Sequence, residues 1–128
     1  YNDSVFMTWR GNHTPNRWDK RQYWKDWDLL HTLYACMPVF VVHEEYLEDQ
    51  GDRILQTYNT VCRSNQKIDA AEMLDHKFLT DDKLVQQTIF ANGYSVIANF
   101  RKSGDYQSDY GFSVAARSSR TFNLKDRK

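Results

Sequence analysis

The sequence predicts an α+β fold in which a strand–helix–strand–helix half precedes an antiparallel β-sheet. In the first half, each of two short apolar runs is followed by a long stretch whose apolar residues have helical spacing. In the second half, the dipeptide Asn92-Gly93 separates two segments rich in β-branched and aromatic residues, which is the strongest short-range signal for a β-hairpin. Alternating strands and helices require a parallel sheet, so the two halves are expected to differ in architecture.

The composition is that of a globular domain without a strong charge bias. The 128 residues are 41% hydrophobic, 15% aromatic and 27% charged. The formal net charge is zero, so we expect neither nucleic acid nor a membrane surface as a partner. No apolar run reaches the length of about 18 residues that a membrane span needs. Because the chain starts at Tyr1, we expect this point to be a processing site or a fragment boundary.

The first strand and the first helix are predicted over residues 4–10 and 19–37. The strand is a nearly continuous apolar run, typical of a strand buried on both faces, and residues 11–17 have loop composition. An apolar stripe then predicts an amphipathic helix of about five turns. The stripe contains Tyr23, Trp27, Leu30, Tyr34 and Met37. Pro38 is expected to end the helix because its ring removes a backbone donor.

The second strand and the second helix are predicted over residues 39–42 and 44–63. Glu44 and Glu45 fall in the first turn of the helix, where its dipole favours negative charge. Gly51 weakens the middle of the helix and marks an expected break. Cys36 and Cys62 match no metal-binding spacing. We expect two small buried thiols, with one disulfide as the alternative.

The second half is predicted to be an antiparallel meander. Residues 70–74 are expected to form a helical turn, and strands are expected over residues 83–91, 94–100, 112–116 and 120–124. Asp81, Asp82 and Lys83 are expected to form a turn between strands rather than a metal site. The change in pattern predicts a boundary near residues 70–76, which divides the chain into residues 1–70 and residues 71–128.

Four stretches carry a resemblance to a known family. They are VFMTWRGN (5–12), LLHTLYACMPVFVVHEEYLEDQGDRILQTYNTVCR (29–63), EMLDHKFLTDDKLVQQTIFANGYSVIANF (72–100) and YGFSV (110–114). Together they resemble the C-terminal part of bacterial glycoside hydrolases related to the endo-α-N-acetylgalactosaminidases. The likeness covers about residues 3–116, and its most distinctive block is residues 72–100.

This resemblance implies a fold and an activity for the parent protein. Residues 1–70 would be the last β/α units of a (β/α)8 barrel, and residues 71–128 would be an antiparallel sheet or part of a β-sandwich. The parent would be a retaining glycoside hydrolase, secreted or periplasmic. Its catalytic carboxylates would lie on earlier barrel strands, outside this chain, so the chain alone is expected to be inactive. Its partners would be a carbohydrate substrate and the rest of the parent chain, with self-association through exposed strand faces.

The barrel interpretation turns the residues after each strand into candidates for substrate binding. Barrel enzymes carry their active sites at the carboxyl ends of the strands, where Trp9, Arg10, Asn12, His13 and His43 are expected. An indole ring offers a flat apolar surface for a sugar ring. The guanidinium, amide and imidazole groups suit hydroxyl, acetamido or carboxylate partners. The alternative is a solvated loop whose indole covers the core.

The residues do not predict a catalytic pair, a metal site or a cofactor. Adjacent residues on a helix point about 100° apart, so Glu44 and Glu45 cannot both face one substrate and are expected to be structural. Asp75 and His76 lack further ligands at a metal-binding spacing. A second function class therefore stays open beside the hydrolase fragment. It is a stand-alone α+β module that binds carbohydrate or a protein partner and has no catalytic activity.

Overall fold

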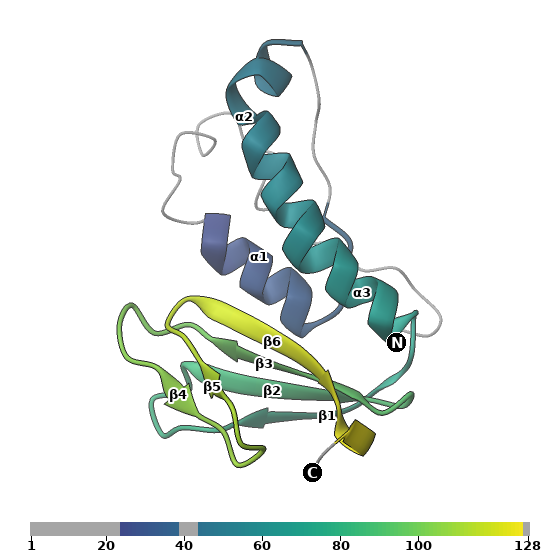
Figure 1. Ribbon diagram of the computed structural model, residues 1–128, viewed down its shortest axis with the longest axis vertical. Coiled ribbons are helices and arrows are strands. Elements are labelled where there is room, and N and C mark those ends of the chain that lie inside the picture. Colours follow the sequence, from purple (N-terminus) through teal and green to yellow (C-terminus); the bar gives the residue numbers. More distant parts are fainter. Residues whose placement is uncertain (1–23, 39–43, 127–128) are drawn as a thin grey trace.

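The computed structural model describes residues 24–38 and 44–126, and these residues form the predicted α+β fold. The helical elements are α1 (Trp24–Leu33), α2 (Glu44–Thr57), the π-helical turn η4 (Tyr58–Cys62), α3 (Arg63–Ile68) and the 3-10 turn η5 (Leu124–Asp126). The strands are β1 (Met73–Phe78), β2 (Val85–Phe90), β3 (Tyr94–Asn99), β4 (Tyr106–Gln107), β5 (Ser113–Val114) and β6 (Ser118–Asn123). Helices α1 and α3 lie over the large sheet, and α2 extends away from it (Figure 1).

Helix α1 confirms the first predicted helix within the described residues but ends earlier than expected. Its last residue is Leu33, whereas the apolar stripe predicts a helix to residue 37. Ala35 adopts a left-handed conformation with φ 51°, and the Cys36 N–H donates to the His31 carbonyl at 2.8 Å. The helix is thus closed by a C-terminal turn before Pro38 is reached.

The second predicted helix is a continuous helical segment that runs through α2, η4 and α3. The expected break at Gly51 is wrong, because α2 continues through this residue. The irregularity lies instead in η4, where the Arg63 N–H donates to the carbonyl of Tyr58, five residues earlier. The segment ends at Asp69, whose left-handed backbone (φ 50°) stops the helix.

The four long strands form one antiparallel sheet in the order β1-β2-β3-β6. The predicted hairpin is confirmed: β2 pairs with β3, and the Gly93 N–H donates to the Phe90 carbonyl at 3.0 Å. Gly93 has a φ of +91°, a conformation that favours glycine. The turn over residues 81–83 lies between β1 and β2, as expected.

Strand β1 corrects the expectation of a helical turn over residues 70–74. Asp69 and Ala70 both have positive φ values, 50° and 57°, so the chain turns sharply after α3 and cannot continue as a right-handed helix. Met73 then pairs with Phe90 on β2, and the register shifts before Asp75. The shift breaks the regular alternation of side chains, which is the signal that would have marked a strand in the sequence.

Each face of the sheet carries its own apolar cluster. On the helix side, buried residues of α1, α3, β2 and β3 pack together. They are Leu29, Leu33, Ile68, Phe90, Val96 and Ala98. On the opposite side, Val85 of β2 and Ile97 of β3 pack against Val114 of β5. The helix-side cluster draws residues from both predicted parts of the chain, so those parts share a core; the division at residue 70 stays a prediction.

Candidate functional site

The substrate-binding residues predicted at the strand tips lie outside the described part of the chain. Trp9, Arg10, Asn12 and His13 precede residue 24, and His43 falls in the gap at residues 39–43. The same holds for the two predicted parallel strands, over residues 4–10 and 39–42. These expectations stay predictions, and the site below is built from described residues alone.

A cavity of about 510 Å³ lies along β6, between α3, the β4–β5 hairpin and η5. We call it the β6 pocket. Its aromatic walls are Tyr94, Tyr110, Phe112 and Phe122. The rings of Tyr110 and Phe122 lie 4.8 Å apart, and those of Phe112 and Phe122 lie 5.0 Å apart. Such spacings are typical of mutually packed aromatic rings, so Tyr110, Phe112 and Phe122 form one connected surface. Tyr94 packs in the helix-side cluster and lines the pocket from the other face of the sheet.

Polar groups of both charges line the same pocket. They are Lys67 of α3, Arg120 and Asn123 of β6, and Asp126 of η5. The Arg120 guanidinium lies over the Phe112 ring, 4.2 Å from its centroid. The Asn123 side-chain oxygen accepts a hydrogen bond from the Lys125 N–H at 2.9 Å, while its Nδ2 group has no partner among the described residues. The pocket therefore presents apolar ring surfaces beside several N–H donors.

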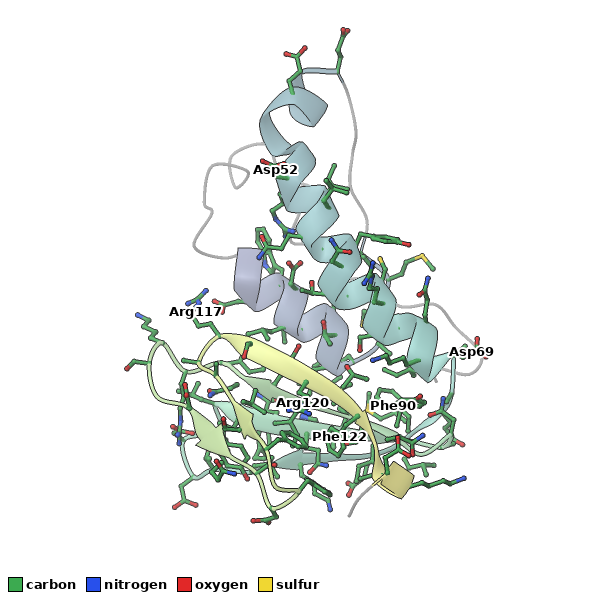
Figure 2. The ribbon with its side chains drawn as sticks, in the orientation of Figure 1. Asp52, Asp69, Phe90, Arg117, Arg120 and Phe122 are labelled. Carbon is green, nitrogen blue, oxygen red and sulfur yellow. The ribbon has the colours of Figure 1, made fainter. Side chains whose placement is uncertain are left out.

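The strand register places the lining residues of β6 on its two faces, with Asn123 opposite Tyr94 on the helix side and Arg120 and Phe122 on the other side. Successive residues of a strand point to opposite faces, so Arg120 and Phe122 both project toward the β4–β5 hairpin, and Figure 2 labels both on β6. Gly111 turns the hairpin with a φ of +90°. Ser108 fixes this turn, because its N–H and its hydroxyl both donate to the Phe112 carbonyl, at 2.9 Å and 2.8 Å.

Reasoning from the sequence missed the β6 pocket. Its walls come from segments of the chain that are distant in sequence, and only the strand order β3-β6 brings Tyr94 next to Asn123. A local signal was nevertheless present. The segment Arg120-Thr121-Phe122 places two large side chains at alternate positions, which in a strand means a shared face.

A second polar cluster connects α1 with α2. The Arg53 guanidinium contacts the Asp28 carboxylate at 3.3 Å, and their side chains are 4% and 15% exposed. The Thr57 hydroxyl donates to the same carboxylate at 2.9 Å and also contacts Arg53. Burial raises the pKa of Asp28, against the opposing effects of Arg53 and Thr57. Both carboxylate oxygens already have partners, so this cluster is best explained as a contact between helices.

His31 lies near this cluster and is almost fully buried, at 1% exposure. Its Nδ1 atom lies 2.6 Å from the Trp27 carbonyl oxygen; because a carbonyl only accepts, Nδ1 carries the proton. Its Nε2 atom is buried and has no partner among the described residues. Burial lowers the pKa of His31 below its ordinary value. Burial therefore favours the neutral imidazole. His31 is absent from the lining of the β6 pocket and of the two smaller cavities beneath the β4–β5 hairpin and beside α1.

The cysteines and acidic residues offer no reactive centre in the described region. Cys36 and Cys62 are free thiols, as expected, but the expected burial is confirmed for Cys36 only, because Cys62 is half-buried. Burial raises the pKa of Cys62, and the charge on Asp28 adds to this effect, so the nucleophilic thiolate is disfavoured. Among the residues that the structure describes, no group of three His, Cys, Asp or Glu side chains is placed to hold a metal ion.

Three cavities lined by described residues each contain one carboxylate. The β6 pocket contains Asp126. A cavity of about 250 Å³ beneath the β4–β5 hairpin contains Asp109, and one of about 260 Å³ beside α1 and β6 contains Asp28. These cavities therefore do not bring two carboxylates together. No helix within residues 24–38 and 44–126 is long and apolar enough to cross a membrane.

Comparison with known proteins does not identify a family. No protein-family model matches the sequence, and no curated protein matches it either. A functional assignment must therefore be argued from the chemistry of the site and from the sequence resemblance.

Proposed function

We propose that this chain is the C-terminal part of a bacterial glycoside hydrolase related to the endo-α-N-acetylgalactosaminidases. In this role it supplies carbohydrate contacts and an antiparallel sheet, and the catalytic carboxylates belong to the preceding part of the parent chain. The observation that carries the proposal is the β6 pocket, which combines aromatic walls with hydrogen-bonding groups. The sequence resemblance over residues 3–116 supports the choice of family.

The chemistry of the β6 pocket suits a sugar ring. A pyranose has an apolar C–H face and a rim of hydroxyl groups, so it needs both a flat aromatic surface and polar partners. Tyr110 and Phe122 offer aromatic surface on one side of β6 and Tyr94 on the other, while Asn123 and Asp126 offer a donor and an acceptor. The cavity of about 510 Å³ falls in the range of about 300–1,000 Å³ that is usual for small-molecule sites.

The acidic residues support a binding role rather than a catalytic one. Glycoside hydrolysis uses two carboxyl groups that flank the scissile bond, about 5–10 Å apart. Each described cavity has one carboxylate, so a second would have to come from elsewhere. The resemblance places the catalytic pair on earlier barrel strands. In the same scheme residues 1–70 complete the barrel, and Trp9, Arg10, Asn12, His13 and His43 line its substrate cleft.

Binding and turnover measurements on the 128-residue chain test the proposal. We expect no hydrolysis of aryl α-N-acetylgalactosaminides. We also expect that a methyl glycoside shifts amide NMR signals of β6, that Tyr94→Leu abolishes these shifts, and that Tyr58→Leu leaves them unchanged. Tyr58 is the matched control because it is 49% exposed on η4, outside the pocket. The proposal is wrong if no sugar shifts these signals, or if the chain shows turnover that a mutation in it abolishes.

One observation favours the alternative, a stand-alone α+β module that binds carbohydrate or a protein partner. The described residues bury an apolar cluster between helices and sheet, in which Leu33, Ile68 and Val96 are at most 1% exposed. Size-exclusion chromatography and acrylamide quenching distinguish the two functions. A monomer that shields Trp24 and Trp27 supports the module. A chain that associates supports the barrel end, because severed strands expose edges and apolar faces.

A further inference from the structure

We propose that the β6 pocket selects an acidic sugar, that is, a pyranose ring bearing a carboxylate. This inference rests on the proposed carbohydrate-binding function and deepens it by naming the chemical class of the ligand. It is carried by the arrangement of Arg120 and Lys67 beside the aromatic walls of the pocket.

The charged groups of the pocket leave an excess of positive charge. Arg120 and Lys67 are cationic, and Asp126 is the one acidic residue of the lining. Neither cation forms an ion pair with a carboxylate among the described residues. By contrast, Arg53 and Arg101 each contact an aspartate. An anionic ligand would therefore meet cationic groups that are not already neutralised by an acidic neighbour.

The position of Arg120 prepares it for a carboxylate. Its guanidinium carbon lies over the Phe112 ring, 4.2 Å from the centroid, which is a cation–π contact, and no hydrogen bond or ion pair to a described residue occupies its N–H groups. Phe112 is itself packed against Phe122, so the platform beneath the guanidinium is held in place. A guanidinium held in this way forms two parallel hydrogen bonds to one carboxylate with little further ordering.

The remaining lining explains why the ligand should be a sugar acid rather than a simple anion. Tyr94 and Tyr110 add aromatic surface, which a small inorganic anion does not use. Asn123 adds an N–H donor, and Asp126 adds an acceptor for ring hydroxyls. Lys67, Arg120 and Asp126 are all exposed, so solvent and salt screen the attraction by the two cations as well as the repulsion by Asp126, and the positive excess of the lining decides the sign.

Titration of the full 128-residue chain with two matched probes tests this inference. The probes are methyl glucuronoside and its neutral counterpart methyl glucoside, each followed through the amide NMR signals of β6. We expect the acidic probe to bind about three- to tenfold more tightly, which is the effect of one charge-assisted contact at an exposed site. The preference should shrink as salt is raised, because exposed charges are screened.

Variants at Arg120 separate charge from geometry. Arg120→Gln should remove the preference for the acidic probe, and Arg120→Lys should keep only part of it because it lacks the planar fork. Arg63→Gln is the matched control: Arg63 is exposed on α3 and outside the pocket lining. Retained amide dispersion shows that each variant is folded.

The outcomes separate the acidic-sugar inference from the proposed function. Equal binding of both probes, or a preference that survives in Arg120→Gln, overturns the acidic-sugar inference and leaves the proposed function in place. Failure of both probes to shift the β6 signals overturns both. A preference that is lost equally in Arg63→Gln also overturns the inference, because the effect would then be one of overall charge.

Discussion

Replacing Leu33 by Ala tests whether the helices and the sheet form one cooperative unit. Leu33 is 0% exposed and packs in the cluster that joins α1 and α3 to β2 and β3. Its backbone carbonyl also accepts a hydrogen bond from the Thr88 hydroxyl at 2.6 Å. The substitution removes three carbon atoms, for a transfer loss of about 2.4 kcal/mol at about 0.8 kcal/mol each. A residual cavity adds to this loss, so we expect about 3–4 kcal/mol.

Urea unfolding followed by far-UV circular dichroism measures this loss, and Leu55→Ala is the matched control. Leu55 belongs to α2 and is 60% exposed, so its truncation should change the free energy of unfolding by less than about 0.5 kcal/mol. Hydrogen exchange at the Ile97 amide reports on β3 in the same samples. The reasoning is refuted if both variants lose the same stability. It is also refuted if Leu33→Ala melts the helices while β3 keeps its protection.

Other substitutions test separate parts of the structure. Arg53→Met leaves Asp28 buried without the Arg53 guanidinium, so we expect the free energy of unfolding in urea to fall by about 3–5 kcal/mol. Adding Asp28→Asn should recover most of this loss. A loss below about 1 kcal/mol would contradict the buried pair. Burial lowers the pKa of His31 in the folded protein, so below pH 6.5 the unfolded chain binds more protons and the free energy of unfolding falls as the pH drops. Thermal melts of His31→Gln should lack this part of the pH dependence. If the melting temperature of the variant depends on pH as that of the wild type does, the buried imidazole is not the cause. Gly93 has a φ of +91°, which an alanine adopts only with strain, whereas a Cβ at Gly51 of α2 meets nothing within 4 Å. Chemical denaturation should therefore show that Gly93→Ala lowers the free energy of unfolding and that Gly51→Ala raises it, each by about 1 kcal/mol. Changes of the same sign would refute this contrast.

The hairpin of β2 and β3 was predictable because its determinants are local. Asn92 and Gly93 favour the turn, and the segments on either side are rich in β-branched and aromatic residues. The structure adds a long-range role for Asn92, whose side-chain amide donates to the carbonyls of Lys67 and Ile68 at 3.0 Å and 2.8 Å. The same residue thus makes the turn and closes the end of α3.

Strand β1 and the end of α1 were not predictable from periodicity, because tertiary contacts override the local pattern there. Leu74 and Phe78 are apolar but 60% and 52% exposed, so the hydrophobic pattern of β1 does not report its buried face. Met37 continues the stripe of α1 in the sequence, yet it is 48% exposed beyond the end of the helix. Prediction from the hydrophobic pattern assumes that apolar residues mark the core. In both places this assumption fails, because the apolar residue is exposed.

The two edges of the described sheet explain why we propose a binding site at β6 rather than at β1. An edge strand exposes backbone groups that invite pairing with another chain, and charged side chains reduce that tendency. The β6 edge carries Arg120 and is flanked by α3, the β4–β5 hairpin and η5, which enclose a cavity. The β1 edge instead exposes Leu74 and Phe78, a surface suited to protein contact. A small polar ligand therefore fits the β6 edge, and the β1 edge is where we expect the rest of the parent chain or a second copy to pack.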